Sequence, residues 1–178
     1  MTPRLKEYAL TAYNSLGANS YRWKKGRYSD AEKSISRVLY DQCHSTGPQT
    51  TGLTTVPKDI QNKELMAHDH YMTPQSATNF IYDNDFILND LDKFFDFYIS
   101  CLKTCYILKS QNQEMKTITK KNILTKDRYK HLGYTLYKDG DPNKIVKELP
   151  VPEYYTEWEI GNNFKFKSSI SSLEEFFI

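Results

Sequence analysis

Leu65-Met66-Ala67-His68-Asp69-His70 is the stretch from which the fold of this 178-residue chain is best predicted. Its apolar run is too short for a helix and ends abruptly in two imidazoles and a carboxylate, so it predicts a strand that ends at polar groups. Such groups are costly to bury without partners. A neutral imidazole serves as a base or a ligand, and a carboxylate binds hard cations, so the triplet is a candidate hydrolytic site. A solvated loop is the alternative explanation.

The longest periodic segment follows this stretch and predicts a helix that begins at Asn84 or Asp85. Apolar residues recur along it at steps of three and four, and mainly acidic residues occupy the other side. Cys101 and Cys105 lie one turn apart, which would suit a metal. Only Cys43-His44 could complete a zinc site with them, and this spacing matches no zinc pattern. We therefore predict that the two cysteines are buried thiols. The apolar stripe consists of Ile87, Leu91, Phe94, Phe95, Tyr98, Leu102 and Cys105.

Two short elements come directly after that helix. Tyr106-Ile107-Leu108 predicts a second strand. Ser110 is suited to cap the next helix, which opens at Gln111 and carries Asn112 near its start. The chain therefore places a strand, a helical segment, a second strand and a second helix in that order.

The N-terminal part predicts two helices and a loop. Apolar spacing predicts a helix from Pro3 to Leu16, with Gly17 as its stop. Ser29-Asp30-Ala31-Glu32 has the pattern of a capping box, and the helix that it opens should end near Cys43. Residues 44–60 are rich in breakers and predict a loop, and residues 71–78 predict a turn through Pro74.

The C-terminal part predicts turns and a small appendage. Asp139-Gly140-Asp141-Pro142 has the composition of a turn. Pro150 and Pro152 mark a joint that separates residues 1–150 from an appendage, residues 151–178. Alternating large apolar residues in the appendage predict a hairpin, followed by a short helix. The hairpin residues are Trp158, Ile160, Phe164 and Phe166, around Gly161-Asn162-Asn163.

Composition indicates a folded protein with one main core. Charged residues make up 26% of the chain and aromatic residues 14%, which excludes a disordered composition. No run is apolar enough to span a membrane, and the N-terminus lacks the apolar core of a signal peptide, so no membrane partner is expected. Three cysteines cannot all pair within one chain, which favours a reducing cytoplasm.

Basic residues gather in two clusters, although the formal net charge is only +2. The first cluster is interleaved with Tyr21, Trp23 and Tyr28, and the second follows Asn112. Acidic residues concentrate elsewhere, at residues 83–96 around the start of the helix predicted near Asn84 and in the last thirty or so residues. Such segregation suits a protein with one face toward a polyanion, although ordinary solvated helix faces would also explain each cluster. The clusters consist of Arg22, Lys24, Lys25 and Arg27, and of Lys116, Lys120, Lys121, Lys126, Arg128 and Lys130.

The order of these parts resembles the ββα-metal (HNH or His-Me finger) endonucleases, particularly the compact phage-borne ones. The resemblance implies an α+β fold: a ββα-metal core with a helical insertion, N-terminal helices and a small β-containing C-terminal tail. It implies that His70 is the general base that activates water, and that Asp69 and Asn112 hold a single divalent metal. His68 is then a candidate for a phosphate contact or for support of the site.

The resemblance also implies a cofactor and a partner. The metal is Mg²⁺, with Mn²⁺ as the alternative, and a structural Zn²⁺ is not expected. The partner is double-stranded DNA, whose backbone phosphates the basic clusters contact. The expected compartment is the cytoplasm, that of a host cell if a phage encodes the chain. The number of subunits stays open, with a homodimer as one arrangement.

Strand geometry and composition leave alternatives open. A regular strand projects His68 and His70 to one face and Asp69 to the other, which favours a His-x-His metal pair as in binuclear metallohydrolases. The nuclease interpretation instead requires the strand to end or bulge at Asp69. The basic and aromatic clusters could also bind nucleic acid without cleaving it. A more compact motif would replace Asn112 by Asn79, Asn84 or Asn89.

Overall fold

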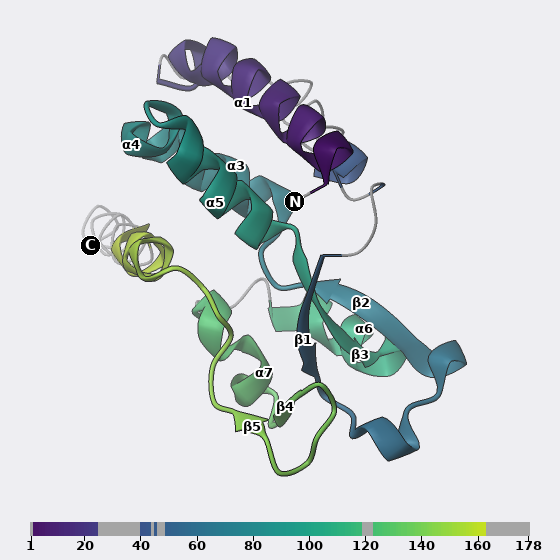
Figure 1. Ribbon diagram of the computed structural model, residues 1–178. Helices are drawn as coiled ribbons and strands as arrows, with labels where there is room; N and C mark the ends of the chain where they lie inside the picture. Colours follow the sequence, from purple (N-terminus) through teal and green to yellow (C-terminus); the bar gives the residue numbers. More distant parts are fainter. Residues whose placement is uncertain (1, 25–39, 44, 46–48, 119–122, 163–178) are drawn as a thin grey trace, which may run out of the picture. The chain divides into compact units, whose positions relative to one another are not determined.

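The computed structural model describes residues 2–24, 40–43, 45, 49–118 and 123–162, without the side chains of residues 19–24 and 116–118 (Figure 1). Helices and a five-stranded sheet in this part of the chain make an α+β fold, which confirms the predicted class. The chain divides into two compact units. The first comprises residues 1–53 and 68–106, and the second comprises residues 54–67 and 107–178.

The sheet has its neighbouring strands in the order β2-β3-β1-β4-β5, and these strands are β1 (Gln49–Thr54), β2 (Met66–His70), β3 (Lys103–Leu108), β4 (Leu136–Lys138) and β5 (Ile145–Val146). β2 and β3 confirm the two predicted strands, although β3 begins three residues before Tyr106. β1 contradicts the loop predicted for residues 44–60. Its backbone is hydrogen-bonded on both sides and Leu53 is buried, so pairing and burial outweigh the breaker Gly52, whose φ is 72°.

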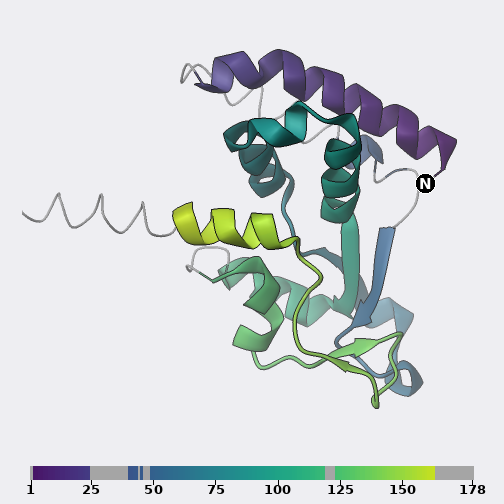
Figure 2. The same cartoon turned by 60° about the vertical axis from the view of Figure 1, so that its left-hand side comes forward.

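Helices dominate the first unit. In Figure 2, α1 (Pro3–Lys24) lies over a cluster formed by α3 (Pro74–Asp83), α4 (Asp85–Leu88) and α5 (Leu91–Cys101), and it contacts all three. The apolar stripe of α1 faces this cluster, because its members are at most 2% exposed. These members are Leu5, Ala9, Ala12 and Leu16.

Aromatic side chains fill the space between these helices. The Tyr13 ring meets the Phe94 ring edge-on with the centroids 5.1 Å apart, and the Tyr13 hydroxyl donates to the Leu88 carbonyl at 2.9 Å. Phe80 and Phe97 lie 4.5 Å apart between ring centroids. Aromatic pairs at these distances contribute about 0.5–1.5 kcal/mol each beyond the burial of their area.

Three of the predicted helix boundaries were wrong. α1 continues past Gly17 to Lys24; a glycine inside a helix costs only about 1 kcal/mol and does not by itself end it. The turn predicted through Pro74 is the start of α3, where the Thr73 side chain caps the helix by accepting from the Ser76 amide at 3.1 Å. The single helix predicted from Asn84 to Cys105 is two helices and the start of β3.

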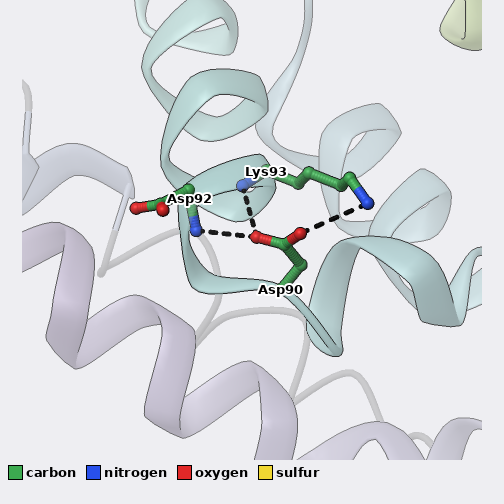
Figure 3. A network of polar contacts seen from close by, with 3 residues as sticks. All are labelled: Asp90, Asp92 and Lys93. Atoms are coloured by element: carbon green, nitrogen blue, oxygen red, sulfur yellow. Dashed lines mark hydrogen bonds and ion pairs between the residues drawn. The ribbon is translucent and has the colours of Figure 1, made fainter.

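Asp90 causes the break between α4 and α5 (Figure 3). Its Oδ1 accepts from the backbone amides of Asp92 and Lys93, both at 3.1 Å, and its Oδ2 lies 3.2 Å from the Lys93 Nζ. This is an N-cap, which satisfies two amides that lack a partner within the helix. The backbone hydrogen bond from Lys93 is the main cause that lowers the pKa of Asp90.

Replacing Asp90 should test this cap. Asp90→Ala should lower the midpoint of thermal unfolding at neutral pH, and Asp90→Asn should lower it less, because asparagine caps as well as aspartate. Since the folded-state pKa is lowered, the charge stabilises the fold above the ordinary carboxyl pKa of about 3.9 and ceases to do so as the pH falls through the lowered value. Thermal scans should therefore show the wild-type and Asp90→Asn midpoints converging in acid. A gap that is constant with pH would contradict this role of the charge.

The second unit is built from short elements. Its helical turns are η1 (Lys58–Ile60), η2 (Lys63–Leu65) and η3 (Thr125–Asp127), and its helices are α6 (Lys109–Ile118), α7 (Arg128–His131) and residues 153–162. α6 confirms the predicted second helix, but it begins at Lys109, so Ser110 lies in its first turn. α6 contacts α7, and the Tyr134 hydroxyl donates to Glu114 on α6.

The hairpin predicted for the appendage is wrong within the described residues. Residues 153–162 are helical, which places Trp158 and Ile160 in a helix, while Phe164, Phe166 and the predicted final helix lie outside the described residues. The sequence has a helical period here that the prediction overlooked, since Tyr155 is buried and the Glu159 side chain, one turn on, accepts from the Thr125 amide at 3.0 Å. Pro152 precedes the first helical residue, as prolines near helix starts do.

Gly140 fixes the turn between β4 and β5, which pair antiparallel with Leu136 opposite Val146. Its φ is +73°, and its carbonyl accepts from the Lys58 amide at 2.9 Å. A Cβ at this position would lie 2.9 Å from both the Cβ and the backbone nitrogen of Lys58. The turn predicted at residues 139–142 is thus confirmed, and it requires a residue without a side chain.

Gly140→Ala should lower the free energy of unfolding by more than the about 1–2 kcal/mol that a left-handed backbone costs an alanine, because the methyl group also displaces Lys58. Gly133→Ala is the matched control: Gly133 has a φ of +75° with nothing within 4 Å of the added Cβ, so it should show only the backbone cost. Denaturant unfolding measures both values. Equal losses in the two variants would show that the Lys58 contact does not matter.

Candidate active site

The predicted triplet lies at the C-terminal end of β2. The strand runs through Asp69 and ends at His70, so it does not end at Asp69 as the nuclease interpretation requires. Strand alternation places His68 and His70 on one face and Asp69 on the other. His68 is exposed, Asp69 is 7% exposed, and His70 is half-buried. The two imidazoles therefore share a face but differ in their contact with water.

His70 packs against Tyr40, in a helical segment at residues 40–43 where the predicted second helix was expected to end. The Tyr40 and His70 ring centroids are 5.8 Å apart in an edge-on contact. Burial lowers the pKa of His70, and the neighbouring Asp69 carboxylate opposes this shift. The lowered pKa favours the neutral imidazole, which is the form that accepts a proton or binds a metal.

His68 contacts two residues of β3. Its Nδ1 lies 3.3 Å from the hydroxyl oxygen of Thr104, and its ring centroid lies 5.2 Å from that of Tyr106. Thr104 and Tyr106 are two residues apart on β3 and so project to the same face as each other. The imidazole is consequently oriented by the adjacent strand, although it is exposed.

Asn112 lies in the first part of α6, directly after β3, as predicted. The preceding residue, Gln111, stabilises the connection between β3 and α6. Its Oε1 accepts hydrogen bonds from the Leu108 amide at 3.0 Å and from the Thr55 hydroxyl. Asn112 belongs to the second unit, whereas Asp69 and His70 belong to the first. Their meeting around one metal stays a prediction.

The predicted phosphate contacts fall largely outside the described side chains. Arg22 and Lys24 lie in the last turns of α1, and Lys116 lies in α6, with only their backbones described. The others are outside the described residues, namely Lys25, Arg27, Lys120 and Lys121.

The donor groups of a site determine which metal ion it can hold. Among the described residues, no three His, Cys, Asp or Glu side chains gather as a metal-binding group. A Mg²⁺ held by one carboxylate and one amide oxygen does not need such a group, because water and phosphate complete its shell. Asp69 and Asn112 are hard oxygen donors, so their chemistry fits that ion. Cys101 and Cys105 are buried, as predicted, and Cys43 is buried as well.

Sequence reasoning missed Tyr40 and Thr104. No local pattern points to Tyr40, because its contact with His70 joins segments thirty positions apart. Thr104 could have been predicted if the second strand had been taken to begin at Lys103. Thr104 then lies two residues before Tyr106, so its side chain projects to the same face of the strand as that of Tyr106. In the described residues no helix has the length and apolar character needed to cross a bilayer.

Comparisons of the chain with protein-family models, with curated proteins and with solved structures find no match.

The lowered pKa of His70 predicts how stability depends on pH. The folded state resists the proton that the unfolded state accepts, so the free energy of unfolding should fall as the pH drops below the ordinary histidine pKa of about 6.5. His70→Gln should remove this component, which denaturant unfolding at a series of pH values measures. Asp69→Asn should lower the pKa of His70 further, as NMR titration would show. Identical pH dependence in wild type and His70→Gln would contradict the burial of a neutral imidazole.

Proposed function

We propose that this protein is a divalent-metal-dependent DNA endonuclease of the ββα-metal type. The order of elements supports this: β2 carries Asp69 and His70 at its C-terminal end, β3 is its hydrogen-bonded neighbour, and α6 follows β3 at once with Asn112 near its start. Because β2 continues through Asp69, the proposal requires a local rearrangement of the strand end that lets Asp69 and His70 act on one phosphate. The helices α3, α4 and α5 occupy the chain between the two strands, where the proposal needs an insertion.

The half-buried position of His70 against Tyr40 is the observation on which the proposal chiefly rests, because burial lowers the pKa of the imidazole and so favours its basic form. His70 takes a proton from a water molecule, and the resulting hydroxide forms a bond to the phosphorus of a phosphodiester. The bond from phosphorus to one ester oxygen breaks, and that oxygen leaves and takes up a proton from solvent. A positioned base of this kind contributes about 10²- to 10⁴-fold.

Asp69 and Asn112 would hold a divalent cation, Mg²⁺ or Mn²⁺, which when bound supplies Lewis-acid stabilisation of the charge on phosphate. The role of the basic residues is to bind the DNA backbone without reading its sequence. Arg22, Lys24, Lys25, Arg27, Lys116, Lys120 and Lys121 are the residues proposed for this contact.

A second candidate function has an observation of its own. Because β2 continues through Asp69, its two imidazoles share one face, which is the arrangement of a His-x-His pair for an imidazole-binding metal such as Zn²⁺. Metal identity distinguishes the candidates. Zn²⁺ retained stoichiometrically through purification favours the histidine pair, whereas a weakly held Mg²⁺ favours the nuclease.

A plasmid-nicking assay tests the proposal. With Mg²⁺ or Mn²⁺ the wild type should nick supercoiled plasmid, and EDTA should stop it. His70→Ala should reduce the rate by at least about 100-fold, because it removes the base, while DNA binding in a gel-shift assay is kept. His131→Ala is the matched control, since it removes an exposed histidine on α7, and it should nick like the wild type.

Two results would count against the nuclease. A wild type that binds DNA but does not nick it with either metal would leave a non-catalytic nucleic-acid-binding protein. Equal nicking rates in His70→Ala and the wild type would show that His70 takes no part in the reaction.

A further inference from the structure

The side chain of Thr104 makes two polar contacts that together determine the state of His68. Its hydroxyl oxygen lies 3.3 Å from the His68 Nδ1 and 3.4 Å from the backbone carbonyl oxygen of Gln49, to which it donates. Thr104 is 1% exposed. All three residues belong to the first unit.

The hydroxyl has one proton for two neighbours. The Gln49 carbonyl can only accept, so it takes that proton. The Thr104 oxygen is then an acceptor toward His68, and Nδ1 must carry a hydrogen. In a neutral imidazole only one nitrogen is protonated, so Nε2 holds the lone pair.

The orientation of the ring decides which edge meets water. Nδ1 faces a buried hydroxyl while His68 as a whole is exposed, so the exposed edge carries Nε2. The Tyr106 ring, 5.2 Å away between centroids, limits rotation of the imidazole. This base-and-orienter arrangement is one that catalytic histidines use.

We propose that Thr104 is a positioning residue that holds His68 as its Nδ1–H tautomer, so that Nε2 accepts a hydrogen bond from a water molecule. For its catalytic consequence this inference rests on the proposed function. In that hydrolysis His68 orients the attacking water beside His70, and it does not donate to a phosphate, because the lone pair on Nε2 would repel phosphate oxygens. The predicted phosphate contact by His68 is thereby replaced by a water contact.

Two-bond ¹H–¹⁵N correlation spectra of the histidine rings test the tautomer without any assay of activity. At about pH 8.5, where ordinary histidines are neutral, wild-type His68 should show a protonated Nδ1 and an unprotonated Nε2. Thr104→Val removes the hydroxyl and keeps the branched shape, so it should shift His68 toward the Nε2–H tautomer. Thr104→Ser keeps the hydroxyl and should preserve the wild-type pattern.

Thr51→Val is the matched control. The Thr51 hydroxyl donates to the backbone carbonyl of Thr104 at 3.0 Å and not to its side-chain hydroxyl, so this variant should leave the His68 pattern unchanged. A protonated Nε2 in the wild type would overturn the proposal, even if Thr104→Val does not fold. An unchanged pattern in a folded Thr104→Val protein would overturn it equally.

Nicking kinetics then test the catalytic consequence. Thr104→Val should lower the nicking rate by about 10- to 100-fold at unchanged DNA affinity, an effect of the size that follows removal of the orienting partner of a metal-bound histidine, and Thr104→Ser should restore it. A wild-type nicking rate in Thr104→Val would show that Thr104 does not contribute to the reaction. A wild type that shows the Nδ1–H tautomer but does not nick would contradict the proposed function and leave the tautomer established.

Discussion

The buried hydroxyl of Tyr40 holds together the part of the first unit that carries the candidate site. Its oxygen lies within hydrogen-bonding distance of two backbone carbonyls, that of Met72 at 3.3 Å and that of Cys101, which share its single proton. Its ring contacts His70 and, at 6.2 Å between centroids, Tyr98. Burial raises the pKa of Tyr40 far above its usual value, so the hydroxyl stays protonated and remains a donor. The segment after β2, the end of α5 and residues 40–43 are thus joined at one side chain. A net contribution of about 1 kcal/mol is typical of such a bond, but a buried carbonyl left without a donor costs more.

The helical segment between β2 and β3 shows how two strands stay neighbours despite their separation in sequence. Closing a long connection costs little more than closing a short one, because the entropy of closure grows only with the logarithm of length. The connection also has a core of its own, in which the Phe94 and Tyr98 rings stack at 5.0 Å between centroids and the Asp90 cap begins α5. Strand pairing and helix packing are therefore compatible, and Thr104 of β3 reaches His68 of β2.

The two histidines show how identical side chains acquire different properties in different surroundings. His68 and His70 are two residues apart on one strand and share a face, yet Thr104 orients the first while Tyr40 shields the second. Groups of one type in different surroundings can take different roles in a reaction. In the proposed hydrolysis, His70 takes the proton of the attacking water and His68 orients that water.

Local chemistry determined several parts of this protein from sequence alone: the strand into His70, the strand through Leu108, the helix that carries Asn112, and the burial of Cys101 and Cys105. Each depends on residues that lie close together in the chain, where periodicity and caps operate. Tertiary structure decided the rest. β1 is a strand because it has a partner on each side, and residues 153–162 are helical because Tyr155 is buried and the Glu159 side chain, one turn on, accepts from the Thr125 amide. The environments of His68 and His70 come from Thr104 and Tyr40, residues thirty or more positions away, because burial and hydrogen bonding depend on what the fold brings near and not on sequence neighbours.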